Sequence, residues 1–180
     1  MHDAITEHSI TLDDRRGHTA FYRASGPVDG TPIVFVHGWP ELSLSWRHQL
    51  RTLGGLGFRC IAADQRGYGR STVYDRVEDY AIEELVADQI ALADTLGIER
   101  AVWVGHDWGS PVVWSVASHH PDRCHGVASL CLPYRTLELG VDALIELVDR
   151  DLYPEDQFPA GQWEYMRFYE EQFLSLIHIS

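Results

Sequence analysis

The chain has 180 residues, of which 45% are hydrophobic and 23% are charged, and its net charge is −13. This size and composition are typical of one globular domain with a sizeable core. The acidic balance argues against nucleic-acid and anionic-membrane partners, because phosphate groups repel such a surface. The chain has no apolar run long enough to cross a bilayer and no secretion-signal pattern at its start, so we expect a cytoplasmic protein. The sequence does not indicate an oligomeric state.

Short apolar runs alternate with helical patterns along the first three quarters of the chain. In chain order we expect strands at 8–12, 19–23 and 33–36, a helix at 44–53, a strand at 58–62, a helix at 82–96, a strand at 101–104, a helix at 111–119 and a strand at 127–132. Alternating strands and helices predict an α/β fold, with a mostly parallel sheet flanked by helices.

Beyond Pro133 the pattern changes to helical stretches at 137–148 and 162–173, joined by a proline-containing loop. These stretches predict the beginning of a helical cap over the sheet. We therefore divide the chain into the N-terminal part of a core (1–133), the beginning of a cap (134–173) and a tail (174–180). The uncharged tail, LSLIHIS, could continue a buried helix, but it also resembles a translated adapter or vector sequence. We favour the second interpretation and leave the tail out of the fold prediction.

The three cysteines predict neither a metal site nor a disulfide framework. Their number is odd and their spacing fits no zinc motif. Cys60 and Cys131 stand in apolar runs, so we expect both to be small core residues. No metal and no cofactor is expected.

The segment 105–109, GHDWG, follows an expected strand and precedes an expected helix. In this context G-x-nucleophile-x-G is a nucleophile elbow, a strained turn that presents its central residue near a helix N-terminus. The central residue is Asp107, which excludes a serine esterase. A carboxylate is suited to displacement at a saturated carbon, which predicts epoxides or alkyl halides as substrates. The alternative is that Asp107 only caps the helix.

A second loop, at the end of the strand expected at 33–36, has the sequence HGWP. Gly38 permits a tight turn, Pro40 fixes its exit, and an aromatic residue before proline favours a cis bond. With the Trp108 amide, backbone amides of this loop would form an oxyanion hole. We therefore predict that His37, Gly38 and Pro40 border a substrate pocket, although an ordinary β-turn is the alternative.

Four segments together resemble the soluble epoxide hydrolases, which are α/β-hydrolases: HGWPE at 37–41, SWRHQ at 45–49, DQRGYGRS at 64–71 and GHDWG at 105–109. The resemblance runs from about residue 10 to residue 173. It implies that Asp107 attacks an epoxide carbon and that Trp39 and Trp108 donate oxyanion-hole amides. It also implies a structural loop at 64–71, in which we interpret Arg66 as an ion-pair residue and Tyr68 as a packing residue.

The resemblance extends to the cap, where the family uses two tyrosines to hydrogen-bond the epoxide oxygen. The segment EYMRFY at 164–169 resembles the one that carries the first of them. Tyr165 matches best, and Tyr169, one helical turn later, is the alternative. Simple packing of an aromatic helix would also explain both residues. The implied reaction converts an epoxide and water into a vicinal diol.

The family's order of catalytic residues is nucleophile, acid and then histidine. The last two follow the cap in the family, whereas this sequence stops inside it and leaves the core incomplete. None of the ten histidines is expected to substitute. We therefore expect that this chain cannot complete turnover, and that at most a reactive epoxide would alkylate Asp107.

Two other functions remain open. A haloalkane or haloacid dehalogenase would use the same aspartate chemistry, but such enzymes usually carry Asn in place of Trp39 or Arg in place of Trp108. These differences, together with Tyr165, favour the epoxide. The other function is non-catalytic ligand binding on the same fold, since such proteins often keep an elbow.

Overall fold

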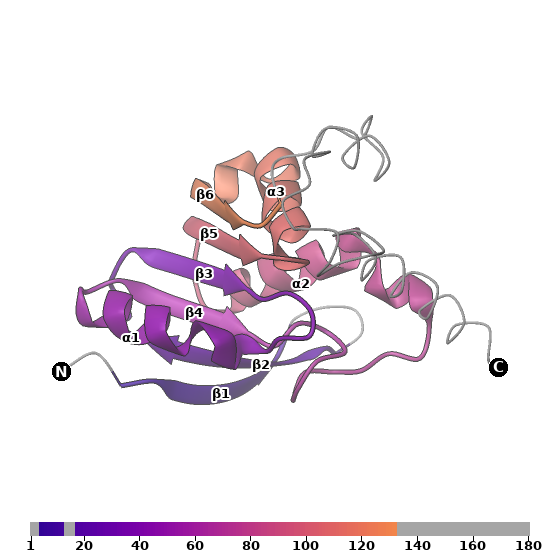
Figure 1. Cartoon of the computed structure of the whole chain (residues 1–180), viewed down its shortest axis with the longest axis horizontal. Helices are drawn as coiled ribbons and strands as arrows, with labels where there is room; N and C mark the ends of the chain where they lie inside the picture. Colours follow the sequence, from indigo (N-terminus) through magenta and orange to yellow (C-terminus); the bar gives the residue numbers. More distant parts are fainter. Residues whose placement is uncertain (1–3, 13–16, 133–180) are drawn as a thin grey trace, which may run out of the picture. The chain divides into compact units, whose positions relative to one another are not determined.

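The computed structural model describes residues 4–12 and 17–132, which contain one six-stranded sheet (Figure 1). Its order is β1-β2-β4-β3-β5-β6, with β1 at Thr6–Thr11, β2 at Thr19–Ser25, β3 at Pro32–Val36, β4 at Arg59–Ala63, β5 at Ala101–His106 and β6 at Cys124–Leu130. The pairs β3–β4, β3–β5 and β5–β6 are parallel, while β2 is antiparallel to both β1 and β4. The predicted α/β fold with a mostly parallel sheet is confirmed.

Three α-helices of the described region flank this sheet (Figure 1). They are α1 at Arg47–Gly55, α2 at Ile82–Thr95 and α3 at Gly109–His119. Short 3-10 turns lie beside them, η1 at Ser43–Trp46, η2 at Val77–Tyr80 and η3 at Pro121–Arg123. Within the described region, no helix is both long enough and apolar enough to cross a membrane.

The central strands bury side chains on both faces, as their continuous apolar sequences predict. On one face, Phe35 of β3 packs with Trp46 and with Leu50 of α1. On the other face, Val34 of the same strand belongs to a larger cluster that includes residues of α2 and α3. The strand alternation therefore places α1 on one side of the sheet and α2 with α3 on the other.

Several predicted boundaries differ from the structure by one to three residues. β6 begins at Cys124 instead of 127, because Cys124 and Gly126 already pair with β5 although this part of the strand has no apolar run. The helix predicted at 44–53 begins as a 3-10 turn and ends at Gly55, and the chain then reverses at Gly57, whose φ is +93°.

The cysteine predictions were half right. Cys60 is fully buried, and burial raises the pKa of its thiol to about 11, so it is an inert core residue. Cys131 is exposed, so its predicted core position was wrong. The reason is that β6 ends at Leu130, and the next residue turns out of the sheet with a φ of +83°.

The predicted cap (134–173), including Tyr165 and Tyr169, and the tail (174–180) lie outside the described residues. The division of the chain at residue 133 therefore stays a prediction.

Candidate active site

The elbow lies between β5 and α3, where the sequence predicts it. Asp107 has a φ of +50°, a backbone conformation that non-glycine residues rarely adopt. Its amide donates a hydrogen bond to the Leu130 carbonyl at 3.2 Å, and its own carbonyl accepts one from the Ser110 amide at 2.9 Å. No side-chain hydrogen bond caps α3. The carboxylate is therefore not used as a helix cap, in contrast to the alternative considered above.

Two glycines of the elbow allow unusually close backbone contacts. A Cβ atom added at Gly105 would lie 2.4 Å from the Gly109 carbonyl oxygen. A Cβ atom added at Gly109 would lie 2.1 Å from the Val36 carbonyl oxygen. Because these neighbours are backbone atoms, any side chain at either position would force β3, β5 and α3 apart.

The loop after β3 contacts Asp107 directly. β3 and β5 are parallel neighbours, so both loops leave the same edge of the sheet. The Trp39 amide donates a hydrogen bond to Oδ1 of Asp107 at 2.8 Å. A Cβ atom added at Gly38 would lie 2.4 Å from the Cβ of Asp107, so only glycine permits this approach. The Trp39–Pro40 bond is cis, as the sequence predicts.

The buried ring of His37 supports this loop through two hydrogen bonds. The ring is fully buried, with Nδ1 donating to the Gly38 carbonyl at 2.8 Å and Nε2 accepting from the Gln65 amide at 2.9 Å. These bonds require a neutral ring with the proton on Nδ1. Burial lowers the pKa of His37, and the hydrogen bond to Gly38 opposes this effect only in part. Whether this loop borders a substrate pocket stays a prediction.

The neutral His37 ring should make the fold sensitive to acid. Because the folded state holds the pKa of His37 below its usual value, the unfolded chain binds a proton that the folded chain does not. This contribution to stability is complete above about pH 6.5 and decreases as the pH falls, by up to about 1.4 kcal/mol per pH unit. Urea unfolding from pH 7.5 to 5 would measure it.

The His37→Gln variant is the control, because its side-chain oxygen would still accept the Gln65 amide but cannot titrate. We expect the free energy of unfolding of this variant to depend less on pH than that of the wild type. Equal dependence in the two proteins would contradict a buried neutral ring.

Hydrogen bonds and ring packing hold the loop at 64–71 beside the site, as expected. Asp64 accepts hydrogen bonds from the amide and hydroxyl of Ser43 at 2.9 and 2.5 Å. The Tyr68 ring meets the His37 ring edge-on, with the centroids 5.0 Å apart. Burial, and then the charge of Asp107, raise the pKa of Tyr68. The tyrosine therefore packs against the HGWP loop, within the electric field of the Asp107 carboxylate.

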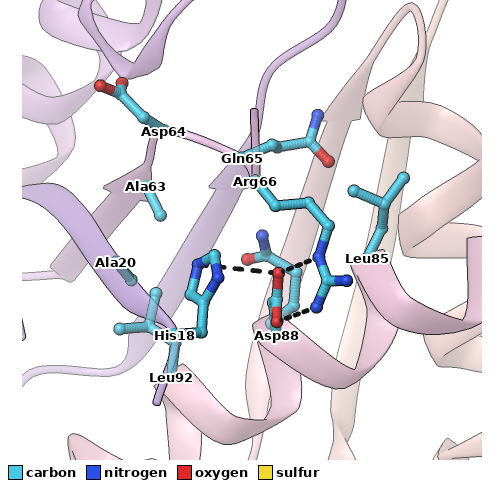
Figure 2. A pocket seen from close by; sticks show the side chains of 10 residues that line it. His18, Ala20, Ala63, Asp64, Gln65, Arg66, Leu85, Asp88 and Leu92 are labelled. Atoms are coloured by element: carbon cyan, nitrogen blue, oxygen red, sulfur yellow. Dashed lines mark hydrogen bonds and ion pairs between the residues drawn. The ribbon is translucent and has the colours of Figure 1, made fainter. Parts of the chain in front are cut away.

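Arg66 of this loop forms a buried ion pair, as interpreted from the sequence. Its Nε and Nη2 atoms each donate to a different oxygen of Asp88, both at 2.6 Å. Figure 2 shows the Asp88 carboxylate between this guanidinium and the ring of His18, whose Nε2 lies 3.7 Å away. All three residues are buried. The network fastens the loop to α2 and to the start of β2.

One contact at the site was not predicted. His106, the last residue of β5, donates from Nδ1 to Oε2 of Glu41 at 3.0 Å. Both residues stand in the motifs HGWPE and GHDWG, but 65 residues separate them and neither motif alone indicates a partner. The pairing of β3 with β5 brings them together.

Trp108 is the N-cap residue of α3 and is 63% exposed, directly after Asp107 in the chain. Its role as an amide donor stays a prediction, as do the roles of Tyr165 and Tyr169, which lie outside the described residues. In the part of the chain that the structure describes, no group of three or more His, Cys, Asp or Glu residues could hold a metal ion.

Comparison with known proteins gives a consistent result. A family described as alpha/beta hydrolase fold matches residues 31–173. Epoxide hydrolase B of Mycobacterium tuberculosis is 48% identical over 121 residues, which are 66% of this chain and 34% of the relative. Bifunctional epoxide hydrolase 2 of Sus scrofa is 41% identical over 105 residues, which are 58% of this chain and 19% of the relative. The chain thus spans about a third or less of these relatives.

Solved structures agree with the sequence matches. The crystal structure of epoxide hydrolase A from Mycobacterium thermoresistibile superposes with a TM-score of 0.72 at 37% identity, over 86% of this chain and 48% of that one. An epoxide hydrolase from Vigna radiata gives a TM-score of 0.70 at 34% identity, over 83% of this chain and 48% of that one.

Proposed function

The chain belongs to the alpha/beta hydrolase fold family, and from this we propose that it acts in epoxide hydrolysis with Asp107 as the nucleophile. The observation that carries the proposal is the 2.8 Å hydrogen bond from the Trp39 amide to a carboxylate on a strained turn. The printed names of the relatives, which are epoxide hydrolases, support the same substrate class.

The hydrogen bond makes the two oxygens of Asp107 unequal. Oδ1 accepts the Trp39 amide, which lowers its electron density, so we assign the attack to Oδ2. After attack through Oδ2, Oδ1 becomes the carbonyl oxygen of the ester. The amide that it keeps would then stabilise the negative charge that develops on this oxygen when water adds.

The first step forms one bond and breaks one. Oδ2 attacks an epoxide carbon, the bond from that carbon to the ring oxygen breaks, and the ring oxygen leaves as an alkoxide. A phenol is a suitable acid to protonate it, and we assign this role to Tyr165, with Tyr169 as the alternative. In the second step, water adds to the ester carbonyl, the acyl C–O bond breaks, and a vicinal diol leaves.

The second step needs a base to take a proton from water. Within residues 4–12 and 17–132, no histidine is hydrogen-bonded to the Asp107 carboxylate, whose described partner is the Trp39 amide. The first step is therefore the one that the described residues support directly. We further propose the Trp108 amide as a second oxyanion donor, the loop of His37, Gly38 and Pro40 as part of the pocket wall, and a cytoplasmic location.

Formation of the ester on Asp107 tests this function. The chain is incubated separately with styrene oxide and with the matched phenylethyl bromide, and then digested for peptide mass mapping. We expect an adduct with the whole mass of the epoxide at Asp107, formed faster than the alkyl adduct from the bromide, in which the halide is lost.

The outcomes separate the competing functions. Faster reaction of the bromide at Asp107 would favour the dehalogenase alternative. No adduct at Asp107 with either reagent would contradict catalysis by this carboxylate and favour ligand binding. Modification confined to histidines or cysteines would count against the proposal as well, because it would reflect only the general reactivity of the reagent.

A further inference from the structure

The pair formed by Glu41 and His106 joins the two loops that make the site. Glu41 follows the oxyanion loop, and His106 directly precedes Asp107. The imidazole Nδ1 lies 3.0 Å from the carboxylate Oε2. Because a carboxylate oxygen only accepts, Nδ1 must carry the proton, whatever the state of Nε2.

Glu41 is fixed to Trp39 through a closed turn. The Glu41 amide donates to the Gly38 carbonyl at 3.1 Å, closing the turn across residues 38–41. The same carbonyl accepts the hydrogen bond from buried His37. A displacement of the Glu41 side chain therefore also displaces the Trp39 amide, which lies inside this turn.

On the other side, His106 is fixed to Asp107 by the chain itself. The His106 carbonyl also lies against the loop, since a Cβ atom added at Gly38 would be 2.7 Å from it. The contacts between the loop and the elbow therefore include the Glu41–His106 bond, the Gly38 contact and the Trp39–Asp107 bond.

We infer that Glu41 and His106 are positioning residues that hold the Trp39 amide against the nucleophile. The side chains of the pair are 34% and 29% exposed, for His106 and Glu41 respectively. Such a hydrated pair contributes little to the stability of a fold. A small displacement of an amide donor, in contrast, has a large effect on a reacting group. The effect of the pair on the site follows from its position and not from its strength.

The first test does not require any reaction. Amide hydrogen exchange at Trp39 is measured in the full chain, in Glu41→Ala and in His106→Ala, with Glu83→Ala as a control that removes an exposed carboxylate from α2. We expect exchange at Trp39 to be about fivefold faster or more in the first two variants, with unchanged exchange in the β3 and β5 strands. Unchanged exchange at Trp39 would overturn the inference.

The second test rests on the proposed function and uses the styrene oxide adduct. Rates are measured over a range of epoxide concentrations, giving a maximal rate and a half-saturating concentration. We expect the maximal rate to fall about 5- to 20-fold in both alanine variants, with little change in the half-saturating concentration. The maximal rate of Glu41→Gln, which keeps an acceptor oxygen, should stay within about twofold of the wild type. The maximal rate of the double alanine variant should be no lower than that of the slower single variant.

The two tests fail differently. If the wild type forms no adduct, the proposed function is contradicted, while the exchange data still decide the inference. If the wild type reacts and both alanine variants react as fast as Glu83→Ala, the inference is overturned and the function stands. A rate loss that only follows the unfolded fraction, measured by thermal denaturation, would also overturn it.

Discussion

The Asp107→Asn variant should form the epoxide adduct at least about a thousandfold more slowly than the wild type, which places it at background. A neutral amide oxygen is a far weaker nucleophile than a carboxylate, although the two groups have nearly the same shape. The variant should fold normally for two reasons. Asparagine tolerates the φ of +50° at this position, and its side-chain oxygen can still accept the Trp39 amide.

Intact-mass spectrometry over time measures this loss, and thermal unfolding verifies that the variant is folded. An alanine at position 107 would be a poorer choice, because it would add backbone strain to the loss of the carboxylate. The mass also reveals any deamidation that restores aspartate. An adduct on position 107 in protein that still carries asparagine would contradict the nucleophile assignment.

Replacement of Arg66 by methionine should lower the free energy of unfolding by about 3–5 kcal/mol, the largest stability effect that we expect. Methionine keeps the apolar stem of the side chain but removes both hydrogen bonds to Asp88, a residue that is only 7% exposed. A buried charge without its partner is strongly destabilising, because burial has already removed most of its hydration. Urea denaturation of the wild type and the variant measures the difference.

Arg76 offers a matched control for this loss. Its ion pair with Glu78 is solvent-exposed, with 73% and 72% of the two side chains accessible. Arg76→Met should therefore cost no more than about 1 kcal/mol. Replacing Asp88 by asparagine in the Arg66→Met background should recover part of the loss, since it removes the unpaired charge. Similar costs for the two methionine variants would contradict the importance that we give to burial.

The elbow and the sheet could be predicted because their signals are local. An apolar strand, two glycines and a helix pattern in sequence leave little choice for the backbone at Asp107. The start of β6 could not be predicted in this way, since Cys124 to Gly126 form a strand by pairing with β5 and not through an apolar pattern. The predicted burial of Cys131 was wrong for a related reason, because its apolar neighbours do not show where the strand ends.

The contacts within the site were predictable only in part. That a loop amide would point to Asp107 follows from the type of loop, and the structure has this bond from Trp39. The bond between Glu41 and His106 depends on the register of β3 against β5, which no local pattern specifies. The buried His37 likewise needs Gln65, from a third loop, to explain its neutral ring.

The close backbone contacts at Gly38, Gly105 and Gly109 also limit how this sequence can evolve. Every single-nucleotide change in a glycine codon that alters the residue introduces a side chain or a stop. At these three positions each such change would push a Cβ atom into backbone or into the side chain of Asp107. Related genes can therefore differ at many surface positions but should keep glycine at these three. A variant library aimed at new substrates is best built with these three codons held constant.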